Sequence, residues 1–161
     1  ERVRVFTGPR PFDAWCAERF EQAYTHLRDV GLPPWAALHA ARALVALWVT
    51  EVGWNETTTE GESNFNPGNI TGHSSYGYFR IPGNPRKFRA YAESDDGVRD
   101  AVSVLSRGRY RAAWDALVLG GDAVEWYSAI LRAGYTTWAQ GLVDTYAGVL
   151  RRIPQRLNRQ R

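Results

Sequence analysis

The sequence has little cysteine. Cys16 is the only one among 161 residues, and no group of Cys and His has the spacing of metal ligands. A single cysteine cannot form an internal disulfide, and a structural zinc site needs a cluster of such ligands. Both a disulfide scaffold and a zinc scaffold are therefore excluded, and Cys16 is predicted to be a small buried hydrophobic residue.

Long hydrophobic runs are also missing. The longest apolar stretch, Pro34 to Val49, is interrupted by His39 and Arg42, whereas a membrane-spanning helix needs about 20 apolar residues. A transmembrane segment is therefore not expected. At 161 residues and 44% hydrophobic composition, the chain is predicted to form one domain, 1–161, with a sizeable core.

Charge and aromatic content indicate several classes of binding partner and do not distinguish among them. The net charge is +3, and the cations gather near the end of the chain and in a second group at Arg80, Arg86, Lys87 and Arg89. Such a surface favours polyanions, whether nucleic acid, anionic lipid or acidic wall polymers, although arginines at a helix end also suit the helix dipole. Seven Trp and eight Tyr pack in cores or form platforms for sugars and bases.

Apolar residues recur with helical spacing over most of the chain. This pattern predicts helices at Phe12 to Val30, Trp35 to Val52, Ser94 to Gly108, Arg109 to Gly120, Asp122 to Gly134, and Trp138 to Pro154. Ser94 and Asp122 are the expected N-caps. The second helix is apolar at nearly every position and is predicted to be the central, buried element.

The middle of the chain breaks this helical pattern. Residues 55–69 are polar and read as a loop, and Ile70 to Tyr91 reads as one hairpin with short irregular strands. The predicted fold is mainly α, a helical domain with a small β-hairpin lobe, and a cleft is expected where the lobe meets the helices.

Glu51 is the most informative single residue. It follows a hydrophobic helix and precedes a polar, glycine-containing loop, which is a half-buried setting of the kind that raises the pKa of a carboxyl group. A carboxyl that keeps its proton can act as a general acid, as in glycosidases. The alternative is a partly exposed acid at a helix end, where the dipole makes it mildly costly.

Four motifs in order give the chain a family resemblance. They are Glu51-x-Gly53-Trp54, Asn66-Pro67-Gly68-Asn69-Ile70, Phe88-Arg89-x-Tyr91 and Ala133-Gly134-Tyr135. In order and spacing they resemble family 73 glycoside hydrolases, the lysozyme-like N-acetylglucosaminidases of bacterial autolysins, flagellar rod-assembly hydrolases and phage lytic proteins. The resemblance covers residues 35–153 as a glycosidase core and leaves the N-terminal helix, within 1–33, outside it.

The resemblance implies roles for particular residues. Glu51 matches the general acid that protonates the glycosidic oxygen, and Tyr135 matches a tyrosine that lines the active site and is implicated in catalysis. Tyr135 is otherwise read as a core tyrosine after a helix end. Substrate-binding candidates are Trp54, Asn69, Tyr76 and Tyr78, for which packing at the base of the hairpin is the alternative.

One feature departs from the family pattern. Many members carry a second glutamate in the hairpin, but Ile70 to Tyr91 contains no Asp or Glu. Glu60 and Glu62 are the candidates for a second carboxylate that activates water in an inverting mechanism. Assistance by the substrate N-acetyl group, or a lytic transglycosylase route using the sugar 6-hydroxyl, would need only one acid.

A second alignment places the acid elsewhere. Glu62-Ser63-x-Phe65-Asn66-Pro67 resembles a motif of soluble lytic transglycosylases, which would make Glu62 the acid. In that family the glutamate ends an apolar helix, whereas Glu62 follows a run of threonines and a glycine that is poor helix. Glu51 is therefore the preferred acid.

The leading hypothesis is a peptidoglycan hydrolase that cuts β-1,4 bonds of the bacterial wall glycan with Glu51 as acid and with no metal or organic cofactor. It would act outside the cytoplasm, in the periplasm or on a virion. The alternatives are a catalytically weak, lysozyme-fold domain that binds wall glycan or serves in a phage tail, injection apparatus or other secreted assembly, and a nucleic-acid-binding domain using the arginine-rich tail. No specific nucleic-acid partner is expected.

Overall fold

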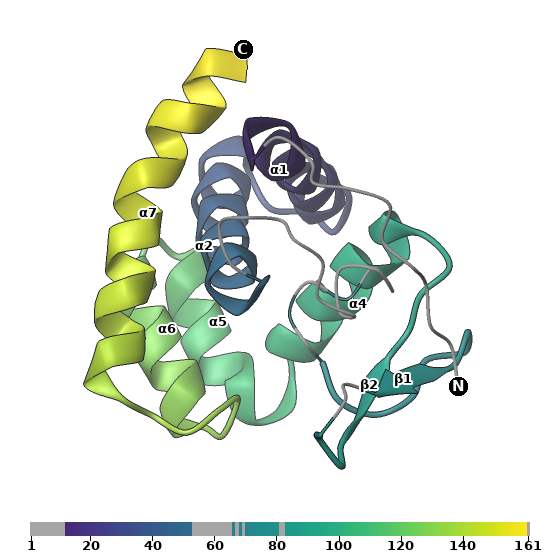
Figure 1. The fold of residues 1–161 in the computed structure, drawn as a ribbon. Coiled ribbons are helices and arrows are strands. Elements are labelled where there is room, and N and C mark those ends of the chain that lie inside the picture. The colour runs from purple at the N-terminus through teal and green to yellow at the C-terminus, as the bar shows by residue number, and fades with distance from the viewer. Residues whose placement is uncertain (1–11, 53–65, 67, 69, 81–82, 161) are drawn as a thin grey trace.

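The computed structural model describes residues 12–52, 66, 68, 70–80 and 83–160 (Figure 1). The elements of this part of the chain are α1 (Phe12–Asp29), α2 (Pro34–Val52), β1 (Tyr78–Arg80), β2 (Lys87–Arg89), α4 (Ser94–Leu105), a 3-10 turn η1 (Gly108–Tyr110), α5 (Arg111–Val118), α6 (Ala123–Arg132) and α7 (Gln140–Gln160). The fold is mainly α with one small antiparallel sheet, as the sequence predicts.

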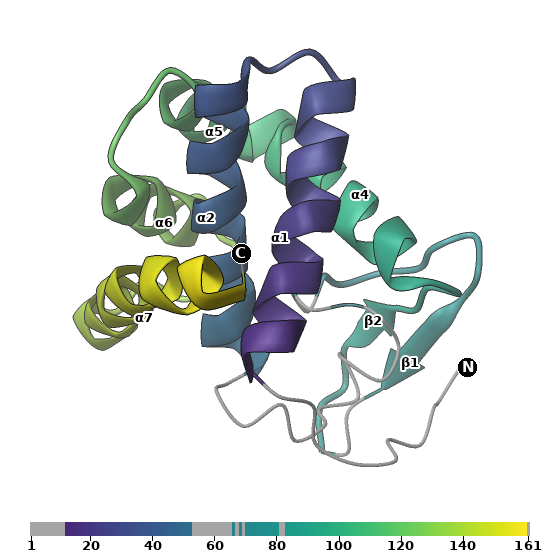
Figure 2. The same cartoon turned by 90° about the horizontal axis from the view of Figure 1, so that it is seen from above.

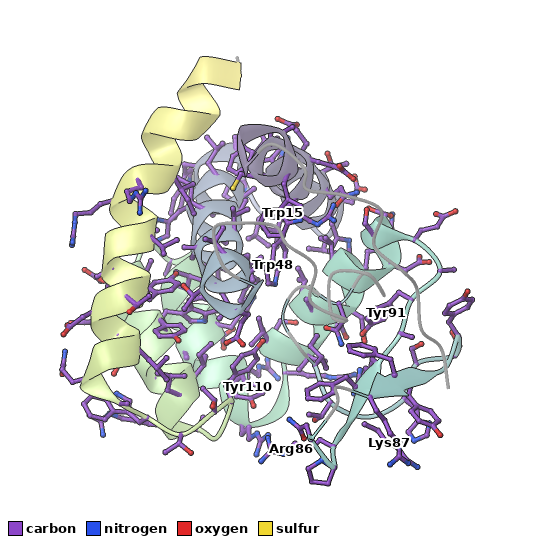
Figure 3. The ribbon with its side chains drawn as sticks, in the orientation of Figure 1. Trp15, Trp48, Arg86, Lys87, Tyr91 and Tyr110 are labelled. Atoms are coloured by element: carbon purple, nitrogen blue, oxygen red, sulfur yellow. The ribbon has the colours of Figure 1, made fainter. Side chains whose placement is uncertain are left out.

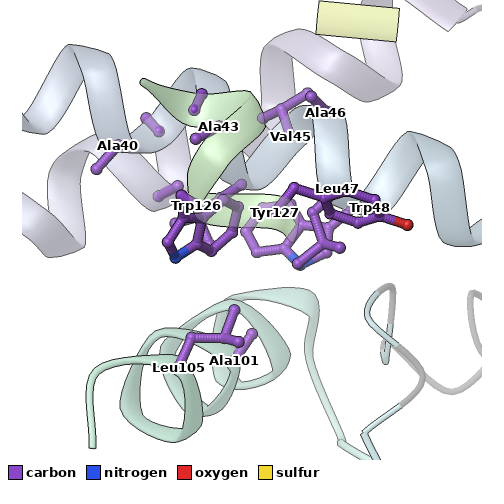
Figure 4. Packing of buried hydrophobic residues seen from close by; sticks show 14 of the residues in the cluster. Ala40, Ala43, Val45, Ala46, Leu47, Trp48, Ala101, Leu105, Trp126 and Tyr127 are labelled. Carbon is purple, nitrogen blue, oxygen red and sulfur yellow. The ribbon is translucent and has the colours of Figure 1, made fainter. Parts of the chain in front are cut away.

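Helix α2 is the central element. Its side chains from Ala40 to Val49 are buried, apart from half-buried Arg42, and α1 and α7 pack against it (Figures 1 and 2). Several of these residues are alanines, whose small side chains let neighbouring helices approach closely. Figure 4 shows Trp126 and Tyr127 of α6 and Leu105 of α4 in the same core cluster as Trp48. The prediction of a buried central helix is confirmed.

The first helix contributes one face to this core. Trp15, Phe20 and Leu27 are buried at helical spacing. Cys16 is also buried, which confirms the predicted burial. Helix α1 lies alongside α2 and also contacts α4 and α7 (Figure 2). It is therefore an integral part of the helical body.

The hairpin forms a separate small lobe. Strand β1 pairs with β2 antiparallel, Phe79 opposite Phe88, and their rings lie 5.6 Å apart. Together with Ala90 they make a second, smaller core. An isolated bridge joins Thr71 to Phe88. The lobe lies on the opposite side of the molecule from α7 (Figures 1 and 2).

Two predicted helix boundaries were wrong. Helix α4 has Glu93, not Ser94, as its N-cap, and the hydroxyl of Ser94 instead accepts a hydrogen bond from Gln22 of α1 at 2.7 Å. A tertiary partner has replaced the local cap. Helix α7 continues through Pro154 to Gln160, although a proline inside a helix removes a hydrogen bond and crowds the preceding turn. Good helix formers such as Gln155 and Arg156 follow it and favour continuation.

The capping prediction for α6 is confirmed. The Asp122 carboxylate accepts hydrogen bonds from the backbone N–H groups of Val124 and Glu125 at 2.7 and 3.2 Å. Among the helices described, none has the length and apolarity to cross a membrane.

Candidate active site

Glu51 lies in the last turn of α2, where the buried helix reaches the surface. Its side chain is half-buried. Its negative charge acts on two tyrosines from other parts of the chain: it raises the pKa of Tyr127 and of Tyr135, in each case as the second cause after burial. The charge of the predicted acid therefore acts on Tyr135.

Tyr135 follows directly on the turn that ends α6. Gly134 adopts a positive φ of 102°, a conformation that favours glycine. The turn directs the Tyr135 hydroxyl to the carbonyl oxygen of Gly68, to which it donates a hydrogen bond at 2.5 Å. Its ring meets the Tyr110 ring edge-on at 5.9 Å. Burial raises its pKa well above the usual value, so the hydroxyl stays protonated and acts as a donor.

Asn66 holds the segment that contains Gly68 against the lobe. Its side-chain oxygen accepts from the N–H of Ile70, and its amide donates to the carbonyls of Ile70 and Arg89 at 2.9 and 2.8 Å. The side chain is buried, so these bonds are shielded from water. Asn66 thus fixes the loop against β2, and Tyr135 anchors the same loop to the helical body.

Two buried polar groups close to these residues have no hydrogen-bond partner among the described residues: the Tyr127 hydroxyl and the indole N–H of Trp48. The Tyr127 ring is fully buried and stacks on Tyr146 at 4.3 Å. Burial, followed by the charge of Glu51, raises the pKa of Tyr127 to about 12. The charge of Glu51 therefore reaches a buried tyrosine of α6.

A cleft of about 740 Å³ separates the lobe from the helices. On the helical side it is lined by Val104, Arg109, Tyr110, Gly134 and Tyr135, and on the lobe side by Ile70, Thr71, Gly72, His73, Pro85, Arg86, Lys87 and Arg89. Figure 3 shows Arg86 and Tyr110 on its two sides. The expected cleft between lobe and helices is present, and Tyr135 lies in its wall.

A second cleft of about 700 Å³ lies on the other side of Arg89. Here Arg89 pairs with Asp100 at 2.8 Å, and the hydroxyl of Tyr91 donates to the same carboxylate. Burial, then the bond to Asp100, raises the pKa of Tyr91. The Arg89 and Tyr91 of the third motif therefore join the lobe to α4.

The predicted site residues separate into three groups. The first group is Glu51 and Tyr135, since the charge of Glu51 acts on Tyr135. Tyr76 lines the second cleft and packs on the small core of the lobe, while Tyr78 lies against His73 at 4.7 Å and under Lys87 at 4.9 Å, outside the described lining of both clefts. Trp54, Glu60, Glu62 and Asn69 lie outside the described residues.

Sequence reasoning missed Tyr127 and Arg109. Both lie on helical segments whose periodicity did not indicate that the charge of Glu51 acts on Tyr127 or that Arg109 lines the cleft. The cations of the lobe could be recognised in the sequence as the cluster Arg86, Lys87 and Arg89. Within the described residues no group of three His, Cys, Asp or Glu side chains is placed to hold a metal ion.

Comparison with known structures identifies the fold. The glycoside hydrolase domain of Salmonella typhimurium FlgJ superposes with a TM-score of 0.62 and 16% sequence identity, over 91% of each chain. The catalytic domain of the autolysin Auto from Listeria monocytogenes superposes with a TM-score of 0.60 and 18% identity, over 96% of this chain and 89% of that one. No family model and no curated protein sequence matches the chain.

These likenesses show that the chain has the mainly α, lysozyme-like fold of both domains. At such low identity the shared feature is the architecture, and function has to be argued from the site itself.

Proposed function

We propose that this protein is a glycoside hydrolase that cleaves β-1,4 bonds in the glycan strands of bacterial peptidoglycan, with Glu51 as the general acid. The observation that carries this proposal is that Tyr135, on which the charge of Glu51 acts, lies in the wall of a large cleft between helices and lobe. The shared fold with two glycoside hydrolase domains supports it. Such an enzyme acts on the wall, outside the cytoplasm, in the periplasm or on a virion.

In the proposed reaction the Glu51 carboxyl gives its proton to the glycosidic oxygen as the bond to the anomeric carbon breaks. Tyr135 has a different role. A tyrosine attacks as a nucleophile through its phenolate, but burial keeps the Tyr135 hydroxyl protonated and bonded to Gly68. It therefore holds the loop of the Asn66 motif at the cleft and forms part of the cleft wall.

The proposal does not assign the second catalytic group. The described lining of the cleft contains no Asp or Glu. An inverting reaction would need Glu60 or Glu62, whereas assistance by the N-acetyl group or attack by the sugar 6-hydroxyl needs Glu51 alone. The products distinguish these routes, because only the last of them leaves an anhydro sugar.

The decisive experiment is mass spectrometry of fragments released from purified peptidoglycan by the wild type and by Glu51→Gln, with Glu125→Gln as control. Glu125 is an exposed glutamate on α6, and its substitution is expected to preserve activity. Release by wild type and loss in Glu51→Gln would establish both the reaction and the acid. Activity that survives in Glu51→Gln and disappears in Glu62→Gln would make Glu62 the acid.

A second candidate function follows from the same gap in carboxylates. The protein would then be a catalytically weak domain that binds wall glycan or forms part of a phage or secreted assembly. The absence of an acid in the described cleft lining favours it. Folded wild-type protein that binds several wall preparations and releases no fragments from any of them would support this function over hydrolysis.

A further inference from the structure

The charged residues in the described lining of the cleft have one sign. Its described lining contains four cations, Arg86, Lys87, Arg89 and Arg109, and no Asp or Glu. Both walls contribute: Arg109 comes from η1 on the helical body, and the other three come from the lobe. A concave surface with cations on both sides concentrates positive potential in the space between them.

The groove continues past Tyr135 with the same character. A further hollow of about 540 Å³ shares Arg86, Gly134 and Tyr135 with the cleft and ends at Arg132 and Trp138. Its described lining also lacks Asp and Glu. The second cleft, beyond Arg89, differs, since Asp96 and Asp100 there balance its arginines. The excess of positive charge is therefore specific to the groove that passes Tyr135.

Most of these cations have no acidic partner within the described part of the chain. Arg89 pairs with Asp100. Lys87 instead lies 4.9 Å from the Tyr78 ring, Arg109 lies 5.0 Å from the Tyr110 ring, and Arg132 lies 4.2 Å from the Trp138 ring. A ring steadies a cation without neutralising it, so its donors remain available to an anion.

A neutral sugar chain does not require a cationic groove, because neutral donors and aromatic faces suffice to bind its hydroxyl and N-acetyl groups. A carboxylate fits such a groove better, since it accepts charge-assisted hydrogen bonds from Arg and Lys. We propose that the groove between Arg109 and the lobe recognises carboxylates borne by the muramic acid substituents of the glycan, so that the ligand is an acidic glycan strand. This inference rests on the proposed function for the identity of the polymer, and it does not depend on cleavage.

The test measures binding to Glu51→Gln protein, which leaves the glycan intact, by calorimetry with soluble glycans of equal length. The first is a neutral N-acetylglucosamine oligomer and the second is a strand that carries peptide stems. The third is a strand stripped of its stems, which keeps the lactyl carboxylates, and the fourth is the stem-bearing strand with its carboxylates methylated. The expected result is that the stem-bearing strand, the stripped strand or both bind at least about tenfold tighter than the neutral oligomer, with a preference that high salt removes. If the carboxylates of the stem are the ligand, methylation removes the preference as well. The lactyl carboxylate is free only in the stripped strand, because the stem is joined to it by an amide bond.

The two sources of carboxylate give different results. Tight binding of the stripped strand would identify the lactyl carboxylate as the ligand, and weak binding of it would identify the carboxylates of the stem. Either result supports the inference. Equal affinity for the neutral, acidic and methylated strands would overturn it, and so would tighter binding of duplex DNA than of any acidic glycan.

Variants locate the interaction in the groove. Arg86→Gln, Lys87→Gln and Arg109→Gln are each expected to weaken binding of the acidic strand by roughly two- to fivefold and to leave the neutral oligomer unaffected. Arg111→Gln and Arg99→Gln remove the same charge from α5 and from the second cleft, and they are expected to change neither. Equal losses in the groove variants and in these controls would show a general charge effect and overturn the site.

Failure of this inference is distinguishable from failure of the proposed function. Preferential binding of acidic glycan by a protein that releases no fragments would leave the groove as a recognition site and remove the hydrolase. Fragment release without any preference for acidic strands would keep the hydrolase and remove the recognition site.

Discussion

At the scale of single residues, Tyr135 connects two parts of the molecule that are 67 positions apart in sequence. Its hydroxyl reaches the backbone of Gly68, and the charge of Glu51 acts on it from the end of α2. Tyr135, whose motif suggests catalysis, thus also anchors the loop at Gly68 to the helical body. Substitutions around it can distinguish the catalytic role from the structural one.

Gly68→Ala tests how tightly this contact is packed. A Cβ at this position would lie 2.9 Å from the Tyr135 hydroxyl oxygen and 3.4 Å from the Trp48 indole nitrogen. We expect the methyl group to displace Tyr135, to lower the free energy of unfolding by about 1–3 kcal/mol and to reduce glycan cleavage. Gly141→Ala is the control, since nothing lies within 4 Å of a Cβ there. Equal denaturation midpoints for the two variants would contradict the tight packing.

The stacked pair Tyr127 and Tyr146 offers a matched comparison. The Tyr146 hydroxyl donates to the carbonyl of Ala43 at 2.8 Å, while the Tyr127 hydroxyl has no partner in the described structure. Tyr146→Phe is expected to lower the free energy of unfolding by about 1 kcal/mol. Tyr127→Phe, which removes an unsatisfied buried group, is expected to be neutral or stabilising. Urea denaturation of both variants measures the difference, and a larger loss in Tyr127→Phe would show that its hydroxyl has a partner.

At the scale of elements, the position of the lobe depends on a few polar contacts. Its own core is small, consisting of Phe79, Phe88 and Ala90 with Tyr76 packed against them. Asn66 and the Arg89–Asp100 ion pair tie it to the loop and to α4. The width of the cleft therefore depends on hydrogen bonds more than on buried apolar area.

Asn66→Ala is expected to loosen the lobe. It would leave the backbone groups of Ile70 and the carbonyl of Arg89 without their side-chain partner, at a cost of about 1–3 kcal/mol. Hydrogen exchange of the lobe should accelerate more than that of α2. Asn84→Ala is the matched control, because its single bond to the Arg86 N–H is exposed. Uniform acceleration throughout the protein would point instead to global destabilisation.

At the scale of the whole molecule, tyrosines are a large part of the core chemistry. Burial raises the pKa of Tyr127 to about 12 and raises those of Tyr135 and Tyr146 well above the usual value. Tyr127 and Tyr146 belong to the main core cluster, and Tyr135 packs against it. The stability of the fold should therefore change in a predictable way at alkaline pH.

Stability should be unaffected by these tyrosines below pH 10 and fall above it. In the unfolded chain a tyrosine loses its proton near pH 10, whereas folded Tyr127 keeps it to about pH 12. Between these values the folded state binds more protons, so raising the pH favours unfolding by up to about 1.4 kcal/mol per pH unit for each such tyrosine. Thermal unfolding at pH 8 to 11 measures the slope, and Tyr127→Phe should make it shallower. A melting temperature that stays constant to pH 11 would contradict the burial of these hydroxyls.

What the sequence determined by itself were the features encoded locally. Apolar periodicity predicted the helices and the burial of α2. The residue type and position of Asp122 predicted that it caps α6. The polar stretch after α2 predicted the hairpin and placed Glu51 at a helix end. Motif order predicted the lysozyme-like fold.

Which residues meet could not be predicted from local sequence. Helix packing brings together residues that are far apart in sequence. Examples are the charge of Glu51 acting on Tyr127, Arg109 in the cleft lining opposite the lobe, and the hydrogen bond between Ser94 and Gln22. For the same reason the basic cluster Arg86, Lys87 and Arg89 lies in the lobe-side lining of the cleft.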